Sequence, residues 1–248
     1  MHTIELLHVH FNFELPPDRV KWLKKPISSA IRELGKHQVE NINTELFYNR
    51  DEETGKSENR YPLIQYKSVK GMAAITGINE GAQALRQLLK VLALEKNQKA
   101  NEKHLLSESN KINLLDYKKP KLDQHTVTLL KYKKNYMVRH WLPLDSVRYK
   151  NWVASAGLDV LTELLDERLP DQISRMLSGT GLIRRMPFMA KTVLITAAHP
   201  LQQVYKEKKI GFDCIFQCNL DLPADIGIGQ VPGIGYGRMF SFNTEEFY

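Results

Sequence analysis

The chain has 248 residues, of which 42% are hydrophobic and 25% are charged. This length suits one large domain or two domains of about 120 residues that each bury a core. The sequence lacks an apolar run of about 18 residues and an apolar signal-peptide core, so we expect a cytoplasmic protein without a membrane span. The net charge of +7 is compatible with a polyanionic partner but does not require one.

The two cysteines, Cys214 and Cys218, lie four positions apart in a predicted strand. At this spacing they would be separated by roughly 13 Å, which is too far for a disulfide bond. We expect reduced thiols packed in a cytoplasmic protein.

The first half of the chain alternates strand and helix patterns. Periodicity and turn signals predict a strand at 4–13, a helix at 18–34 with Pro26 inside it, a strand at 42–48, a hairpin at 61–78 turning at Lys70-Gly71, a helix after Asn79 and a closing strand at 107–117. If the two strands of the hairpin at 61–78 are counted as one split strand, the order is β-α-β-β-α-β, which is the ferredoxin-like arrangement.

The pattern restarts after a charged segment, Lys118–Lys121, which we interpret as a linker. A long strand is predicted at 127–142, a helical region from Asp145 or Ser146 to Leu177 with breaks at Gly157 and Pro170, and strands at 187–198, 204–218 and 239–242. The predicted fold is therefore α+β, with two tandem ferredoxin-like (RRM-like) domains at residues 1–121 and 122–248. Each domain has the order βαββαβ, and the second is modified.

A glycine-rich segment at 222–238 is the most specific feature of the sequence. Five of the 14 glycines fall within eleven residues: Gly227, Gly229, Gly233, Gly235 and Gly237. Successive glycine amides can bind phosphate oxygens, with Arg238 available to supply charge. No Gly-Lys-Ser/Thr follows, so this is not a Walker loop. A structural turn is an equally good interpretation of glycine density alone.

Three blocks of sequence carry a resemblance to a known family. The first is FDCIFQCNL at 212–220, leading into Leu222-Pro223 and the glycine-rich segment. The second is RYPLIQYK at 60–67 followed by ITGINEG at 75–81, and the third is WLPL at 141–144 with LSGTG at 177–181. Together they resemble the CRISPR-repeat-processing endoribonuclease family of the RAMP superfamily.

That resemblance implies two ferredoxin-like domains and a metal-free endoribonuclease without a cofactor. Its substrate would be CRISPR precursor RNA, cut within the repeats to give guide RNAs. The 2′-hydroxyl would attack the neighbouring phosphate and leave 2′,3′-cyclic phosphate and 5′-hydroxyl ends. It also implies a monomer or homodimer that can associate with other CRISPR effector subunits.

The proton-transfer candidate is His37, which lies just past the first helix, where family members commonly place a catalytic histidine. Histidine titrates near neutral pH and suits either proton role. Lys36 could stabilise phosphate charge, with Tyr48 and Arg50 as helpers. Relatives often carry histidine where this chain has Tyr48-Asn49-Arg50, and this departure favours the alternative of a non-catalytic RNA-binding protein of the same fold. An exposed histidine near a helix end is the structural alternative for His37.

Basic residues interleaved with aromatic ones are predicted to bind RNA. They are Lys131, Lys133, Lys134 and Arg139 in the long strand, and Arg184 and Arg185 after Gly181. Solvated charge is the alternative interpretation of both groups.

The remaining histidines give weaker signals. His8 and His10 share a strand face, but no third ligand lies at a recognisable spacing, so no metal is expected. His140 and His199 are minor candidates. An unrelated binding protein, in which the glycine-rich segment is only a turn, is the third interpretation of the whole chain.

Overall fold

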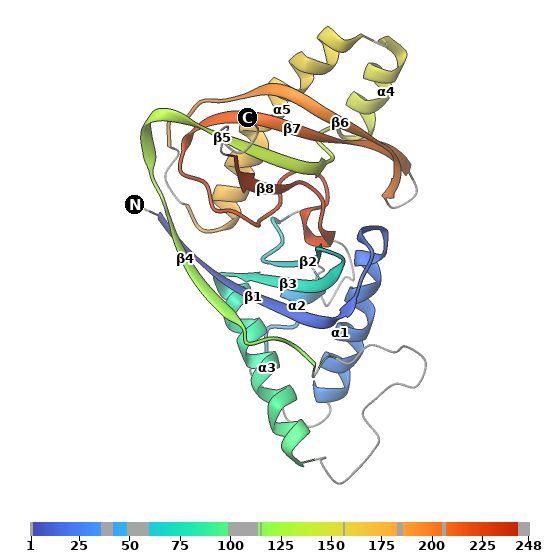
Figure 1. Cartoon of the computed structure of the whole chain (residues 1–248), viewed down its shortest axis with the longest axis vertical. Helices are drawn as coiled ribbons and strands as arrows, with labels where there is room; N and C mark the ends of the chain where they lie inside the picture. The colour runs from blue at the N-terminus through green and yellow to red at the C-terminus, as the bar shows by residue number, and fades with distance from the viewer. Residues whose placement is uncertain are drawn as a thin grey trace. The chain divides into compact units, whose positions relative to one another are not determined.

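The computed structural model describes residues 2–35, 42–48, 60–98, 114, 116–155, 157–182, 186–204 and 207–242 (Figure 1). The strands are β1 (His2–Glu14), β2 (Ile64–Val69), β3 (Met72–Ile78), β4 (Lys121–Val127), β5 (Leu129–Trp141), β6 (Ala190–Val204), β7 (Glu207–Leu220) and β8 (Arg238–Ser241). The α-helices are α1 (Val20–Gly35), α2 (Glu45–Tyr48), α3 (Glu80–Gln98), α4 (Ser146–Ser155) and α5 (Leu158–Gly179). None of these helices is long and apolar enough to cross a membrane.

The chain forms two compact units. Glu5–Gln124 make up one, called here the N-terminal unit, and His125–Tyr248 with Met1–Ile4 make up the other, the C-terminal unit. The two four-stranded sheets have the orders β2-β3-β1-β4 and β6-β7-β5-β8. The first and third strands of each unit are central in its sheet: β1 and β3 in one, β5 and β7 in the other. This is the ferredoxin-like strand order. The predicted fold class of two tandem ferredoxin-like domains is confirmed.

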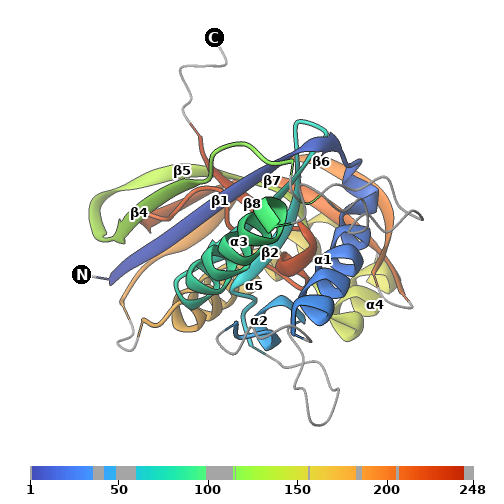
Figure 2. The same ribbon diagram turned by 90° about the horizontal axis from the view of Figure 1, so that it is seen from below.

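The β2–β3 hairpin and the two long helices of the N-terminal unit form as predicted. Lys70 and Gly71 have φ of 52° and 79°, as a tight hairpin turn requires. Figures 1 and 2 show α1 and α3 on the same side of the sheet. The buried residues of these helices recur at helical spacing: Val20, Leu23, Ile27 and Ile31 in α1, and Ala82, Leu85, Leu88, Leu89 and Leu92 in α3.

Residues 42–48, predicted as a strand, end in the short helix α2. Leu46 and Phe47 are adjacent in sequence and both buried, whereas adjacent residues of a strand point to opposite faces. The carbonyl of Phe47 accepts a hydrogen bond from the hydroxyl of Tyr66, 3.1 Å away. Tertiary contacts therefore decide the conformation, and β2 supplies the strand that this segment was expected to form.

The outer strand beside β1 is β4, which lies later in the sequence than the predicted closing strand at 107–117. Residues 107–113 lie outside the described residues, and Tyr117 forms an isolated bridge with Phe11. The amide of Lys118 donates to the carbonyl of His10 (2.8 Å). The segment that we interpreted as a linker thus runs along β1.

The C-terminal unit differs from its prediction in two places. The long strand expected at 127–142 is broken at Thr128 into β4 and β5, which belong to different sheets. Gly157 precedes the first residue of α5, as predicted, but Pro170 lies inside this helix rather than ending it. Leu165, Leu169 and Ile173 are fully buried on either side of the proline. Their packing holds the helix together although proline removes one backbone donor.

The modification of the second domain lies between β7 and β8. In the N-terminal unit a helix, α3, follows the third strand of the repeat. In the C-terminal unit the glycine-rich segment follows the third strand instead, with one 3-10 turn at Pro232–Ile234. The modification predicted for the second domain is therefore the replacement of its second helix by this segment.

Candidate nucleic-acid interface

The glycine-rich segment is built as an extension of the C-terminal sheet. Gly227 and Arg238 form an antiparallel bridge. The amide of Ile228 donates to the carbonyl of Gly237 (2.9 Å), and the amide of Met239 donates to the carbonyl of Ile226 (3.0 Å). Ile226 and Ile228 are buried. The segment is therefore a packed part of the domain.

At two positions the segment needs glycine because its backbone lies in direct contact with another part of the backbone. Gly237 has φ of 66°, and a Cβ atom there would lie 1.7 Å from the carbonyl oxygen of Ile228. Gly229 has φ of 106°, and its Cβ would lie 3.0 Å from the carbonyl oxygen of Leu142. No other residue type combines positive φ with so close an approach. The structural-turn interpretation explains these two glycines.

The amides of the segment only partly match the predicted phosphate clamp. The amide of Gly235 donates to the carbonyl of Pro232 (3.2 Å), and that of Gly237 donates to the carbonyl of His140 (3.1 Å). These two amides are therefore already used, which corrects the expectation of a row of bare donors. Gly229 and Gly233 are partly exposed, and among the described residues no hydrogen bond from either amide is found. They remain the candidates for binding phosphate.

Arg238 is not the free cation that the sequence suggested. Its Nη2 and Nε atoms lie 2.5 and 2.8 Å from Oδ1 of Asp225. Its guanidinium carbon also lies 4.7 Å from the centre of the Phe240 ring. Since its charge is already paired, Arg238 holds the segment against β8.

The basic stretch of β5 divides into exposed and packed residues. Lys131 and Lys133 are exposed, and Tyr132 between them is 83% exposed. Lys134 instead pairs with Asp221, with Nζ 2.9 Å from Oδ1. Tyr136 is buried, and its hydroxyl donates to the carbonyl of Leu220. The exposed part suits a polyanion, and the paired Lys134 does not.

A second cationic and aromatic group lies where β5 pairs with β8. Arg139 is exposed and directly opposite Arg238 in the strand register. The guanidinium of Arg139 lies over the Phe240 ring, 5.5 Å from its centre. A guanidinium beside a half-buried ring can bind a phosphate next to a stacked base.

Most of the predicted catalytic residues fall outside the described part of the chain. These are His37, Lys36 and Arg50, and the same holds for the basic pair Arg184 and Arg185. Tyr48 is described, at the end of α2 and half-buried. Its hydroxyl donates to the carbonyl of Ser28 (3.1 Å), and its own carbonyl accepts from Nζ of Lys24 (2.6 Å). Tyr48 is therefore held against α1 by these two hydrogen bonds. The helix α1 ends two residues before His37.

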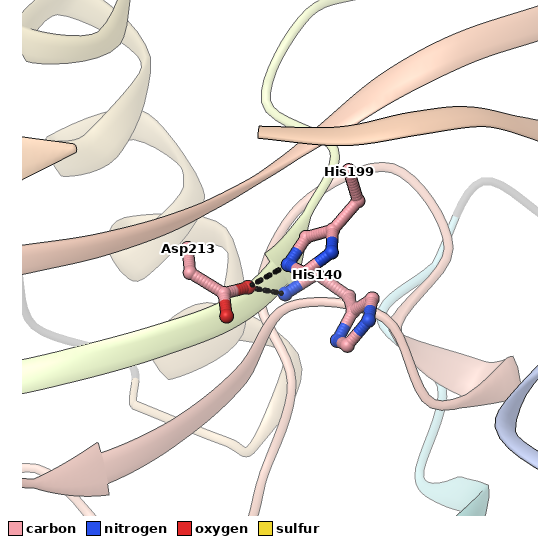
Figure 3. A group of neighbouring side chains, drawn as sticks. All are labelled: His140, His199 and Asp213. Atoms are coloured by element: carbon pink, nitrogen blue, oxygen red, sulfur yellow. Dashed lines mark hydrogen bonds and ion pairs between the residues drawn. The ribbon is translucent and has the colours of Figure 1, made fainter. Parts of the chain in front are cut away.

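The structure brings together three residues that the sequence did not combine: His140, His199 and Asp213 (Figure 3). Oδ1 of Asp213 accepts a hydrogen bond from the backbone amide of His140 (2.7 Å) and lies 2.8 Å from Nε2 of His199. The two imidazole rings are stacked, with centroids 4.0 Å apart and planes 17° from parallel. Burial lowers the pKa of His140 below its usual value, as does the neighbouring His199.

One signal for this cluster is present in the sequence. Asp213 lies between the apolar residues Phe212 and Cys214, which are buried in β7. A carboxylate inside such a strand is expected to have a partner. Which partner it has depends on the pairing of β7 with β5 and β6, which single-chain periodicity does not reveal.

The fold and this interface place the chain among proteins built from two ferredoxin-like domains with a glycine-rich segment in the second. The family profile of the Cas6b N-terminal domain matches residues 4–112, and that of the Cas6b C-terminal domain matches residues 124–242. The chain belongs to the Cas6b family.

Solved structures agree with this fold. One described as a crystal structure of Cas6b has a TM-score of 0.67 at 20% identity and covers 97% of this chain and 100% of its own. One described as CRISPR RNA processing endoribonuclease Cas6b has a TM-score of 0.59 at 17% identity, with the same coverage. A type IV Cas6 crRNA endonuclease, Csf5, has a TM-score of 0.54 at 15% identity and covers 98% of this chain and 100% of its own. No protein with a curated description matches the chain.

Proposed function

We propose that this chain is an endoribonuclease that cleaves CRISPR precursor RNA within its repeats. The observation that carries the proposal is the match of both Cas6b domains, in order, along the chain. The similar structure described as a CRISPR RNA processing endoribonuclease supports it, as do the exposed cations and aromatic ring on β5.

The proposed chemistry is attack of a ribose 2′-hydroxyl on the adjacent phosphate, without a metal ion. His37 would transfer the proton, and Lys36 and Arg50 would stabilise the charge on the phosphate. Tyr48, at the end of α2, would orient this group, since its hydroxyl donates to the carbonyl of Ser28 on α1. The products would carry 2′,3′-cyclic phosphate and 5′-hydroxyl ends.

The test is cleavage of an end-labelled repeat RNA in the presence of a chelator. The wild-type protein should cut at one position, and His37→Ala should slow cleavage by about 10²–10⁴-fold, as loss of a general acid or base does. His104→Ala removes a histidine that is not among the predicted catalytic residues, so as a control it should cleave normally. A substrate with a single 2′-deoxyribose before the scissile phosphate should bind but stay intact. Normal cleavage by His37→Ala would reject the assignment of His37.

RNA binding is proposed to use Lys131, Tyr132 and Lys133. Each lysine that contacts a phosphate adds about 1 to the slope of log affinity against log salt, so Lys131→Gln and Lys133→Gln should each lower the slope by about 1. Lys134→Gln is the control, because its ammonium is already paired with Asp221. Tyr132→Ala should weaken binding by about 1–3 kcal/mol if a base stacks on the ring.

The second candidate function is RNA binding without turnover. The sequence Tyr48-Asn49-Arg50 favours it, because the resembled relatives often carry histidine at this place. Under this alternative the same assay gives salt-dependent binding and no product, and His37→Ala leaves the affinity for RNA unchanged.

A further inference from the structure

The cluster of His140, His199 and Asp213 lies where three neighbouring strands of the C-terminal sheet are irregular. Asp213 is on the central strand β7, His140 on β5 and His199 on β6. The β5–β7 register shifts between Val138 and Trp141, and the β6–β7 register shifts on both sides of His199. Bulges redirect side chains and are over-represented next to functional sites.

The backbone of His140 has an unusual conformation within this irregular region. Its φ is 49°, in the left-handed region that non-glycine residues seldom occupy. The carboxylate of Asp213 holds the amide of His140, and the carbonyl of His140 accepts from the amide of Gly237. The surrounding chain therefore fixes a strained conformation, and such strain is concentrated at functional sites.

The three side chains offer the donor types that divalent transition metals prefer. One ring nitrogen from each histidine and one carboxylate oxygen all lie within 4.8 Å of one another. Nε2 of His199 is shielded from solvent and lies 2.8 Å from Oδ1 of Asp213, but the contact lacks the alignment of a hydrogen bond. Two imidazoles and a carboxylate are a ligand set typical of zinc and related ions.

We propose that His140, His199 and Asp213 bind one divalent transition-metal ion, with water as the remaining ligand. In the arrangement shown in Figure 3 the two rings are nearly parallel, so their lone pairs do not converge on one point. The ring of His140 must turn about its side-chain bonds to bind the ion.

The ion would have a structural role. It would join β5, β6 and β7 at their bulges and stabilise the strained His140, whose carbonyl holds Gly237 in the glycine-rich segment. Cleavage that survives a chelator is compatible with this role, because the ion would not take part in the reaction.

The test measures metal binding directly and uses no RNA, so its result does not depend on the proposed function. Untagged protein is stripped with a chelator, dialysed and titrated with Co²⁺, with the visible absorption of bound cobalt as the signal, and then with Zn²⁺ by calorimetry. We expect one equivalent of each ion, with zinc displacing cobalt. His199→Ala and Asp213→Asn should weaken binding on the order of 100-fold or more, since metal sites are sensitive even to loss of their outer hydrogen bonds.

Two controls keep the test decisive. His125→Ala removes a histidine of the same unit that hydrogen bonds to the carbonyl of Asp221, and it should bind the ion as the wild type does. His140→Asn keeps a residue type that tolerates positive φ, so it should fold but lose the ion. Zinc should raise the melting temperature of the wild type and leave that of His140→Asn unchanged. The absence of one-site binding, or equal binding by the wild type and Asp213→Asn, would overturn the proposal.

Discussion

The two units place different structures after the third strand of the same strand order. In the N-terminal unit the chain forms α3, which buries Leu85 and Leu88 against the sheet. In the C-terminal unit it forms the glycine-rich segment, which buries Ile226 and Ile228 and bridges to β8. A helix bonds most of its backbone groups internally, whereas the segment bonds several of its amides to carbonyls outside it, such as those of Leu142 and His140. The difference shows that this position in the fold needs a buried apolar layer, which a helix or a compact loop can supply.

Both α3 and the glycine-rich segment lie in close contact with a neighbouring stretch of backbone. A Cβ atom at Gly81, in the first turn of α3, would lie 2.1 Å from the carbonyl oxygen of Leu63. One at Gly237 would lie 1.7 Å from the carbonyl oxygen of Ile228. In each unit a glycine therefore lets the connecting segment lie directly against its neighbour.

The largest expected effect comes from Gly237→Ala. The added methyl group meets the carbonyl oxygen of Ile228, the residue whose amide donates to the carbonyl of Gly237, so these two parts of the segment must separate. We expect the free energy of unfolding of the C-terminal unit to fall by more than about 4 kcal/mol, or the unit not to fold. Denaturant unfolding followed by the fluorescence of Trp141 and Trp152 measures it.

Gly71→Ala is the matched control for this effect. Gly71 also has positive φ, of 79°, but a Cβ atom there would meet nothing within 4 Å. It should cost only the conformational strain of about 1–2 kcal/mol. Equal costs at the two positions would show that the contact at Gly237 is easily relieved and that the comparison with Gly81 does not hold.

The next largest effect tests whether the segment buries a true core. Ile228→Ala and Leu85→Ala remove side chains that are both 1% exposed, one from each unit. Each should lower the free energy of unfolding of its unit by about 2–4 kcal/mol. If the segment were a detachable surface loop, Ile228→Ala would cost under about 0.5 kcal/mol while Leu85→Ala kept its full cost.

Local signals in the sequence predicted most of the fold. Periodic apolar residues predicted α1 and α3, and Lys70-Gly71 predicted the hairpin turn, because those features depend on neighbours within a few residues. The prediction of a strand at 42–48 was wrong because Leu46 and Phe47 are buried by contacts with distant parts of the unit. The break at Thr128 was missed for a similar reason, since β4 and β5 join different sheets.

The candidate site was less predictable than the fold. Gly227 to Arg238 stood out by composition, but the pairing of Arg238 with Asp225 depends on the ladder with β8. The cluster of His140, His199 and Asp213 depends on the registers and bulges of three strands. His140 lies 59 positions before His199 and 73 before Asp213, so no local pattern in the sequence combines it with them.

A smaller effect distinguishes how helices begin in the two units. In the C-terminal unit the carboxylate of Asp145 accepts from the amides of Val147 and Arg148 at the start of α4. In the N-terminal unit the side-chain oxygen of Asn79 instead accepts from the amide of Glu5 on β1. Asp145→Ala should therefore lower the free energy of unfolding by about 1 kcal/mol, as loss of a helix cap does.

The effect of Asp145 should depend on pH. The hydrogen bond from the Arg148 amide, together with the Arg148 side chain, lowers the pKa of Asp145 below its usual value. A lowered pKa gives stability that is present above the unfolded pKa of about 3.9 and is lost as the pH falls through the folded pKa. The difference between wild type and Asp145→Ala should thus be full at about pH 6 and shrink as the pH falls below about 4. Asn79→Ala, which removes no titrating group, should show a constant difference.

The smallest effect concerns the ion pairs that tie each connecting segment to its sheet. Arg86 of α3 lies 3.0 Å from Glu5 of β1, and Asp225 of the glycine-rich segment pairs with Arg238 of β8. Double-mutant cycles with Arg86→Gln and Glu5→Gln, and with Arg238→Gln and Asp225→Asn, should each give a coupling of about 0.5–1 kcal/mol that falls with added salt.

The variants of the second cycle also decide the role of Arg238. If Arg238 only holds the segment, Asp225→Asn leaves the affinity for RNA unchanged. If Arg238 binds phosphate once it is released from Asp225, Asp225→Asn raises the affinity for RNA and steepens its salt dependence, and adding Arg238→Gln abolishes both changes.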